Sequence, residues 1–369
     1  MEATFAALSY STAGASFAWV TGGHAETGAA LGFACACFVS WLRLPPAVKV
    51  PAAGGAVVIS GASSGIGRAA AEELAALGFT VFAGVRKSAD GEPLKAAGCQ
   101  PIILDVTSEA SIVAAAAQVK KELGERNQPL VAVVNNAGVS GSGLPLELET
   151  EENLQFVFGA NVFGIVRMNQ AFLPLLRDSN PGGGGRIVNI GSVLGHLQTP
   201  LSGTYCMTKH AVEALSGCSR AELARFGISV SVLRPGYVRT GIASKSSEHA
   251  AVQLAKLRAQ FPEAQQALYP HVFDEAIQSK LRASSLKKFE ICPPPSTSTT
   301  PAIVHAITSG RPKLEYPVAC LQPNSSFPSA AWGLWVLSLI PSASKLGYFA
   351  SMDPGARAMK KNSKSKKET

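Results

Sequence analysis

The chain of 369 residues is 47% hydrophobic and 16% charged, which excludes a disordered or strongly acidic protein because enough apolar surface exists to build a core. Its formal net charge is +8, but residues 357–369 contain six Lys or Arg and one Glu, a net +5. The rest of the chain carries only 8 − 5 = +3, so we expect no nucleic-acid partner. Seven scattered cysteines without CxxC spacing indicate no metal site and a reducing compartment.

Residues 1–54 differ in composition from everything that follows. Thr27–Leu42 carries no charge, and Arg43 and Lys49 come after it. Sixteen residues of helix span about 24 Å, less than the roughly 30 Å of a hydrocarbon core. A membrane anchor is the favoured interpretation, while a targeting peptide and a buried or loose extension stay open. Prolines and glycines at 45–55 then indicate a linker.

From residue 56 onward, short apolar runs alternate with helical patterns. Continuous apolar runs are typical of parallel strands that are buried on both faces. The predicted strands are Ala56–Ser60, Thr80–Val85, Pro101–Val106, Leu130–Asn135, Arg186–Ile190, Ile228–Leu233 and Leu314–Val318. The predicted helices include Arg68–Leu77, Ser108–Leu123, Leu154–Leu176 and Thr208–Phe226. This alternation predicts an α/β fold with one doubly wound, Rossmann-type parallel sheet, forming a single catalytic domain over 55–320.

Two segments near the end of the chain have no strand pattern. Residues 241–300 are polar and partly helical, and we interpret them as a substrate lid. The segment 321–369 combines an apolar patch with a basic C-terminal tail. Its apolar run, Ala330–Ile340, has 11 residues and is too short to span a membrane alone, so it favours a membrane-surface patch or part of the lid.

A glycine-rich turn with the sequence SGASSGIG follows the first predicted strand at residues 60–67 and leads into a helix. Gly61 permits the tight turn, Gly65 lets the backbone approach a pyrophosphate, and Gly67 allows close packing of the helix on the strand. Phosphates would then bind at the positive end of that helix. The turn therefore predicts dinucleotide binding, with contacts from Gly61, Ser63, Ser64, Gly65, Ile66 and Gly67.

The residues at the ends of the second, third and fourth strands indicate which cofactor binds. Arg86 and Lys87 follow the second strand where many dinucleotide enzymes have a carboxylate, and a guanidinium suits a 2′-phosphate. The sequence therefore favours NADP(H) over NAD(H). Asp105, at the end of the third strand, is placed to accept the adenine amino group, with Val106 beside it. Further cofactor contacts are predicted after the fourth strand, at Asn136, Ala137 and Gly138.

A candidate catalytic group consists of Ser192, Tyr205 and Lys209. Tyr205 and Lys209 are four residues apart and therefore share one helix face, while Ser192 ends the fifth strand. Reduction of a carbonyl requires a proton for the developing alkoxide, and a phenol with a pKa of about 10 is a weak acid for that role. A neighbouring ammonium and an oxidised nicotinamide would lower the pKa of Tyr205. Asn161 is placed to support a water that relays the proton.

These motifs resemble the short-chain dehydrogenase/reductase family over residues 55–320, through SGASSGIG, NNAG, Asn161, Ser192, YCMTK and RPG at 234–236. The resemblance implies a catalytic tetrad of Asn161, Ser192, Tyr205 and Lys209, in which the lysine also binds nicotinamide ribose hydroxyls. It also implies contacts from Pro235, Gly236 and Thr240 to the nicotinamide amide. The family's motif usually begins with Thr where this chain has Ser60, which keeps the hydroxyl.

The runs 78–87, 160–177 and 305–312 are more narrowly similar to the branch that contains 17β-hydroxysteroid and retinol dehydrogenases. The expected activity is therefore NADP(H)-dependent interconversion of a carbonyl and an alcohol on a hydrophobic, steroid- or retinoid-like small molecule. A 3-oxoacyl or 3-ketosphinganine-type lipid reductase and a catalytically silent nucleotide-sensing protein are the alternatives. The resemblance also implies a homodimer or homotetramer formed partly through the helices at 154–176 and 208–226.

The end of the chain carries a candidate localisation signal. Lys366 and Lys367 lie at the fourth and third positions from the carboxyl terminus and resemble a dilysine retrieval signal of the endoplasmic reticulum. Arg43 and Lys49 follow the apolar run, and positive residues prefer the cytoplasmic side. The sequence thus predicts an endoplasmic-reticulum membrane protein with a cytosolic catalytic domain. A merely solvated tail, and a cytoplasmic, plastid or mitochondrial location, stay open.

Overall fold

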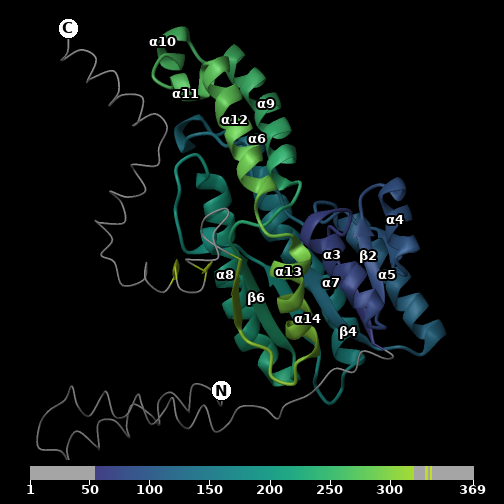
Figure 1. Ribbon diagram of the computed structural model, residues 1–369. Coiled ribbons are helices and arrows are strands. Elements are labelled where there is room, and N and C mark those ends of the chain that lie inside the picture. The colour runs from purple at the N-terminus through teal and green to yellow at the C-terminus, as the bar shows by residue number, and fades with distance from the viewer. Residues whose placement is uncertain (1–54, 320–328, 331–332, 335–369) are drawn as a thin grey trace, which may run out of the picture. The chain divides into compact units, whose positions relative to one another are not determined.

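The computed structural model describes residues 55–319, 329–330 and 333–334 (Figure 1). The predicted N-terminal anchor, the dilysine signal and most of the apolar run Ala330–Ile340 lie outside these residues. The described part is a seven-stranded parallel sheet in the order β3-β2-β1-β4-β5-β6-β7. Its strands are β1 (Ala56–Ile59), β2 (Thr80–Val85), β3 (Gln100–Ile103), β4 (Leu130–Asn135), β5 (Arg186–Ile190), β6 (Ser229–Pro235) and β7 (Glu315–Val318). The predicted doubly wound fold is therefore confirmed.

The sheet is covered by helices on both faces (Figure 1). Val57 and Ile59 of β1 pack with the helices of one face, while Val58 packs with those of the other face. Period-two alternation along a strand sends successive side chains to opposite faces, so a strand buried on both faces must be apolar throughout. The covering helices are α3 (Gly65–Ala76) and α14 (Thr300–Thr308) on one face, and α5 (Glu109–Arg126) and α7 (Gly164–Asp178) on the other.

Two predicted boundaries near the candidate site need correction, and the other predicted ends shift by about three residues or fewer. The strand predicted at Pro101–Val106 ends at Ile103, because Asp105 instead forms a local turn in which its carboxylate accepts from the Thr107 backbone N–H at 2.9 Å and hydroxyl at 2.7 Å. The helix predicted to begin at Thr208 begins at Gly203, as α8 (Gly203–Leu223). Tyr205 therefore lies in the first turn of α8.

Buried amides join α7 and α8 to the sheet. Asn135 Nδ2 of β4 donates to Asn169 Oδ1 of α7 at 3.0 Å and to Asn189 Oδ1 of β5 at 2.8 Å. Asn189 Nδ2 in turn donates to Ser216 Oγ of α8 at 2.9 Å. Buried polar groups are costly unless they are paired, so these bonds fix how both helices lie on the sheet.

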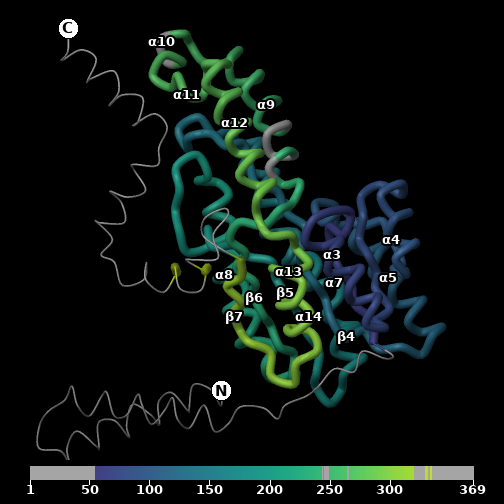
Figure 2. Tube along the Cα trace, viewed as in Figure 1, coloured from purple at the N-terminus to yellow at the C-terminus, as the bar shows by residue number. Residues whose placement is uncertain are grey.

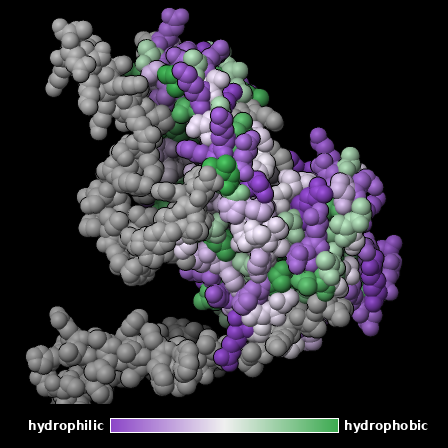
Figure 3. Space-filling view, in the orientation of Figure 1, coloured by the Kyte–Doolittle hydropathy of each residue, from purple (hydrophilic) through white to green (hydrophobic). Residues whose placement is uncertain are grey.

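The segment predicted as a lid forms helices and no strand. It consists of α9 (Ile242–Gln260), α10 (Glu263–Gln266), α11 (Pro270–Phe273), α12 (Glu275–Glu290) and α13 (Pro295–Ser298). Helices α9 to α12 project away from the sheet (Figure 2), and hydrophilic and apolar side chains are interspersed over this part of the surface (Figure 3). An apolar cluster that includes Leu144, Leu148, Leu254, Leu257 and Val272 packs the second half of α9, together with α11, against the loop that follows β4.

Candidate active site

The site lies where the order of the strands along the sheet reverses, between β1 and β4. From β1 the chain winds outward to β2 and β3, and it then returns to β4 on the other side of β1. The loops after β1 and β4 therefore diverge at the carboxyl edge of the sheet and leave a crevice, which is where open α/β sheets bind ligands. The predicted glycine-rich turn follows β1, and Asn136, Ala137 and Gly138 follow β4.

Glycine is required at two points of this crevice. Gly61 has a φ of +66°, and a Cβ added there would lie 2.8 Å from Ala137 Cα. A Cβ added at Gly67 would lie 2.3 Å from Asn136 Nδ2 and 2.5 Å from the Gly61 carbonyl oxygen. Both positions exclude any side chain, so the two loops can approach closely and keep an open cradle of main-chain groups at the start of α3.

Ser60 has a defined role in this arrangement. Its Oγ accepts from the backbone N–H groups of Asn136 at 3.0 Å and Ala137 at 3.1 Å. Asn136 Nδ2 donates back to the carbonyl oxygens of Ser60 at 2.9 Å and Gly61 at 3.0 Å. These reciprocal bonds tie the turn after β1 to the loop after β4, which explains why a hydroxyl is needed at position 60. The remaining turn residues, Ser63, Ser64 and Ile66, are partly exposed, and Ile66 packs against the apolar core.

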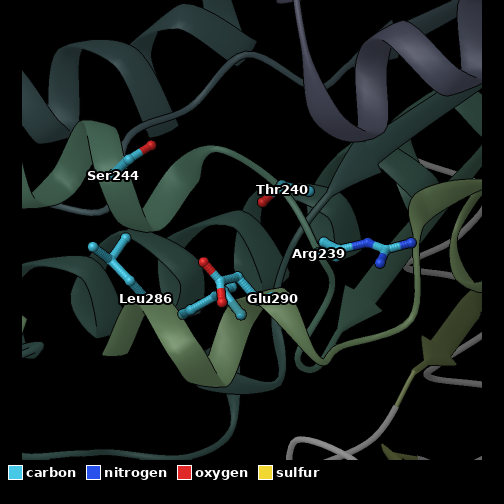
Figure 4. Close-up of a pocket in the computed structure, with 6 residues that line it drawn as sticks. Arg239, Thr240, Ser244, Leu286 and Glu290 are labelled. Atoms are coloured by element: carbon cyan, nitrogen blue, oxygen red, sulfur yellow. The ribbon is translucent and has the colours of Figure 1, made fainter. Parts of the chain in front are cut away.

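The predicted nicotinamide residues lie beside the turn. Pro235 ends β6, Gly236 N donates to the Val318 carbonyl at 3.0 Å, and the Thr240 methyl lies 3.2 Å from where a Cβ of Gly65 would be. A pocket of about 480 Å³ is lined by residues including Gly65, Thr240 and Arg239. A second pocket of about 330 Å³ lies between the start of α9 and the end of α12 (Figure 4), lined by Arg239, Thr240, Ser244, Leu286, Phe289 and Glu290.

Arg239 is a polar residue of this region that the sequence did not point out. It is exposed, it is among the residues that line both pockets, and it directly precedes Thr240. The only signal for it in the sequence is this adjacency to a residue already assigned to the cofactor.

The predicted adenine-side residues differ from one another in their surroundings. Arg86 follows β2 and is exposed, and no ion pair or hydrogen bond of its side chain is found among residues 55–319. One carboxylate oxygen of Asp105 is occupied by Thr107, as described above. Val106 is buried in the core and packs closely on Gly164, because a Cβ added at Gly164 would lie 3.0 Å from the Val106 side chain. Its side chain therefore serves packing.

Ser192, Tyr205 and Lys209 come together as predicted. Ser192 lies close enough to the Tyr205 phenol for its side chain to lower the pKa of that phenol. Lys209 Nζ lies 5.5 Å from the centroid of the Tyr205 ring and donates to the Ile190 carbonyl at the end of β5 at 2.8 Å. Ser192 Oγ accepts from Leu194 N at 3.1 Å, which fixes the turn after β5 and with it the position of the hydroxyl.

The pKa of Tyr205 differs from the expectation, and burial also shifts the pKa of Lys209. Burial raises the pKa of Tyr205 to about 12, with the Ser192 side chain opposing the rise. Burial also lowers the pKa of Lys209 to about 8, with the Glu213 carboxylate opposing the fall. The predicted lowering of the tyrosine pKa by the ammonium is therefore wrong for the protein alone, because removing both groups from water outweighs their interaction.

Asn161 has a structural setting that the sequence did not indicate. It lies in a π-helical turn, η3 (Gly159–Phe163), between α6 (Glu151–Phe158) and α7. Its Nδ2 donates to the Val139 carbonyl at 2.8 Å and to Thr208 Oγ1 at 3.0 Å, and its Oδ1 accepts from Val139 N at 2.8 Å. Both amide hydrogens are therefore occupied, so they cannot hold the relay water, and the side chain instead holds the loop after β4 against α8.

Two further groups around the tetrad were missed. Thr208 Oγ1 accepts from Asn161 and donates to the Tyr205 carbonyl at 2.8 Å. Glu213, one turn beyond Lys209, accepts from Arg234 Nε and Nη2, each at 2.9 Å. Burial alone would raise the pKa of Glu213, but hydrogen bonds from His196 and Arg234 lower it below its usual range. The Glu213 spacing of four residues after Lys209 was the one available signal.

The arrangement can deliver a proton beside a dinucleotide cradle. A phenol, a serine hydroxyl and an ammonium meet at the carboxyl end of β5, next to the crevice between β1 and β4. Within the described residues no group of three or more His, Cys, Asp or Glu side chains is placed to hold a metal ion.

The comparisons with known proteins agree with this site. A family model described as short chain dehydrogenase matches residues 55–251. Retinol dehydrogenase 5 of Mus musculus is 34% identical over 282 residues, covering 75% of this chain and 84% of the relative. The mitochondrial D-beta-hydroxybutyrate dehydrogenase of Rattus norvegicus is 33% identical over 276 residues, covering 72% and 77%.

A solved structure gives the same result. The short chain dehydrogenase/reductase from Burkholderia phymatum, in complex with NAD, is 30% identical with a TM-score of 0.53, covering 70% of this chain and 88% of that one. The chain therefore belongs to the short-chain dehydrogenase/reductase family, in its retinol dehydrogenase branch.

Proposed function

We propose that this protein is an NADP(H)-dependent oxidoreductase that interconverts a carbonyl and an alcohol on a hydrophobic, steroid- or retinoid-like substrate. The observation that carries the proposal is the meeting of Tyr205, Ser192 and Lys209 beside the glycine cradle. A binding protein without catalysis would not need a buried lysine at this place, since burying an ammonium is costly. A turnover assay with NADPH across retinal, steroid ketone and 3-oxoacyl thioester panels tests the substrate class.

The cradle fits a dinucleotide because the positions of Gly61 and Gly67 admit no side chain. When bound there, the nicotinamide supplies the hydride that reaches the carbonyl carbon. Ser192 Oγ holds the substrate oxygen, and Tyr205 donates its proton to that oxygen as it gains charge. The Lys209 ammonium stabilises the phenolate left on Tyr205, and its other donors serve the nicotinamide ribose hydroxyls. In the oxidative direction the same groups remove the alcohol proton.

The preference for NADP(H) is supported by Arg86. Its exposed guanidinium follows β2, at the place where the ribose 2′ position of a dinucleotide lies in this type of sheet. A guanidinium binds a phosphate through two parallel hydrogen bonds, whereas a carboxylate would repel it. Lys87, also exposed, adds a second positive charge.

The hydrophobic substrate is supported by the likeness to retinol dehydrogenases and by Leu286 and Phe289, which line the pocket between α9 and α12. The relative named for hydroxybutyrate points to a small acid instead, so the panel assay includes 3-hydroxybutyrate. A homodimer is supported by exposed apolar side chains on neighbouring helical segments: Phe156, Phe163, Val166 and Met207.

Membrane attachment at the endoplasmic reticulum is supported by the uncharged run Thr27–Leu42 with Arg43 and Lys49 after it, and by the terminal Lys366 and Lys367. Among the described residues, the stretch Glu151–Asp178 is long and apolar enough to cross a membrane. It supplies Met168, Phe172 and Leu176 to the core of the domain, so it is not a candidate anchor.

Replacement of Tyr205 by Phe removes the proton donor and keeps the ring. We expect turnover to fall at least about 100-fold, the usual contribution of a positioned acid, while NADPH affinity changes little. Steady-state turnover and fluorescence titration of NADPH measure the two effects. Retention of more than about 10% of the rate would show that another group delivers the proton.

The pH dependence of carbonyl reduction reports on Lys209. Its pKa of about 8 means that the ammonium is charged below that pH and neutral above it. We therefore expect kcat/KM for reduction to fall as the pH rises through about 8, while Tyr205, with a pKa of about 12, still carries its proton. Lys209→Arg, which stays charged, should abolish this fall in kcat/KM, although its overall rate should be lower than that of the wild type. A wild-type profile that is flat from pH 6 to 10 contradicts the assignment.

Arg86→Asp should weaken NADP binding by roughly 10- to 100-fold, the loss expected for a charged hydrogen-bonded contact, and improve NAD binding. Lys87→Asp makes the same charge change at the next exposed position and should weaken NADP binding less than Arg86→Asp, because an ammonium lacks the paired hydrogen bonds of a guanidinium. Titration of both cofactors into wild type and both variants measures the effect. Equal wild-type affinity for NADP and NAD would overturn the proposed preference.

Extraction of membranes with alkaline carbonate tests attachment. The full chain should stay in the pellet, and a variant lacking residues 1–54 should move to the supernatant. Complete release of the full chain would contradict an integral anchor.

A further inference from the structure

A buried polar cluster lies beside the catalytic group but contains none of its members. The Glu149 carboxylate accepts from Thr204 Oγ1 at 2.6 Å, from Ser142 Oγ at 2.9 Å and from Asn153 Nδ2 at 2.7 Å. These three donors are 3%, 2% and 0% exposed. Buried donors that lose an acceptor pay their full desolvation cost, so a single carboxylate holds three separate segments together.

Each segment bears on the active site. Thr204 directly precedes Tyr205 in the first turn of α8, and Ser142 lies on the loop that begins with the cofactor residues Asn136–Gly138. Asn153 lies on α6, which continues through the π-helical turn that carries Asn161. Glu149 bonds neither to the glycine cradle nor to the catalytic side chains. It bonds instead to one segment beside the cradle and to another beside Tyr205.

The cluster extends to the lid. Because a carboxylate only accepts, Asn153 must present Nδ2 to Glu149 and Oδ1 to the other side, where His249 Nε2 lies at 2.7 Å. His249 therefore donates through Nε2, which carries a hydrogen in the required neutral tautomer and in the cation alike. Its ring also stacks on Phe156 of α6, with centroids 5.0 Å apart.

Helix α9 itself connects this cluster to the cofactor side. It begins at Ile242, two residues after Thr240, whose methyl group lies against the position of Gly65. His249 lies two turns further along, about 10 Å on the helix axis. One rigid helix is thus fixed at its start beside the dinucleotide cradle and two turns later by the chain His249–Asn153–Glu149–Thr204.

We infer that Glu149 is a positioning residue which, through Asn153 and His249, couples the seating of lid helix α9 to the position of the α8 turn that carries Tyr205. This inference rests on the proposed function for its kinetic consequence only. Closure of α9 over a bound dinucleotide would then reinforce the placement of the proton donor. Loosening of α9 would displace that donor without any change in the residues that touch substrate.

Paired variants at the two ends of the chain of bonds test the coupling. Thr204→Val removes the hydroxyl and keeps the shape, and His249→Phe removes the Asn153 bond and keeps an aromatic ring on Phe156. We expect each to lower kcat about fivefold to tenfold, because the proton donor is held less firmly in place, with NADPH affinity within about twofold. Thr204→Ser and His249→Gln, which keep a donor, should recover most of the rate.

Lys256→Gln is the matched control. Lys256 Nζ of α9 pairs with Glu152 of α6 at 2.7 Å on the surface, between the same two helices. Exposed pairs contribute little, so this variant should change kcat by less than about twofold. An effect as large as that of His249→Phe would show that any α9–α6 contact matters equally, which overturns the specific role of the cluster.

Hydrogen exchange on the full chain separates this inference from the proposed function, because it needs no substrate. His249→Phe should speed amide exchange in the first turn of α8 as well as in α9, and Thr204→Val should do so in α9 as well as in α8. Exchange that rises only around the substituted residue overturns the coupling, whatever the activity. Absence of turnover in wild type on every panel, with exchange coupled as described, would contradict the proposed function alone.

The pH profile of kcat supplies a further check. Because His249 donates through Nε2 in both protonation states, His249→Gln should leave the shape of the profile unchanged. A displaced limb would place His249 on a proton path and overturn its role as a positioning residue.

Discussion

The carboxyl edge of the sheet depends on one constraint: main-chain groups that leave the β ladder must find partners where the loops after β1 and β4 diverge. Ser60, Asn136 and Asn161 meet this constraint with short polar side chains that bond directly to the main chain. Such bonds satisfy groups that would otherwise be costly to bury, and they leave the glycine cradle empty of side chains. The crevice is therefore rigid because its walls are bonded to each other.

Helix α8 is the element on which the other parts converge. Along its buried side, Thr204 bonds to Glu149, Thr208 to Asn161, Lys209 to the end of β5, and Ser216 to Asn189. These contacts recur at roughly helical spacing, so any rotation of α8 would break several of them at once. The positions of Tyr205 and Lys209 are therefore set by α8, which is held in place from its first turn to its middle.

Much of this was accessible from the sequence because it depends on local patterns. Continuous apolar runs located all seven strands, and the glycine turn, Ser192, Tyr205 and Lys209 each lie at the end of a strand or on one helix face. Glu149, Thr204 and His249 carry no local signal, since they are separated by tens of residues and meet only through the fold. The π-helical turn at Asn161 was also missed, because the apolar pattern over 154–176 was interpreted as one continuous helix without an interruption.

The directions of the pKa shifts of Tyr205 and Lys209 could not be predicted from the sequence for a different reason. Proximity of Tyr205 and Lys209 suggested that charge attraction would decide, whereas the depth at which both lie made solvation the larger effect. Burial is a property of the whole domain, and four residues of spacing contain no information about it.

The buried Lys209 has a consequence for the thermodynamics of the folded chain. Its pKa falls from 10.5 to about 8 on folding, so between these values the unfolded chain binds more protons than the native one. The free energy of unfolding contributed by this residue therefore rises with pH across that interval. The protein would be most stable in the form in which Lys209 has lost its charge, whereas chemistry needs the charged form. The domain carries a destabilised ammonium at neutral pH, and its other contacts must offset that cost.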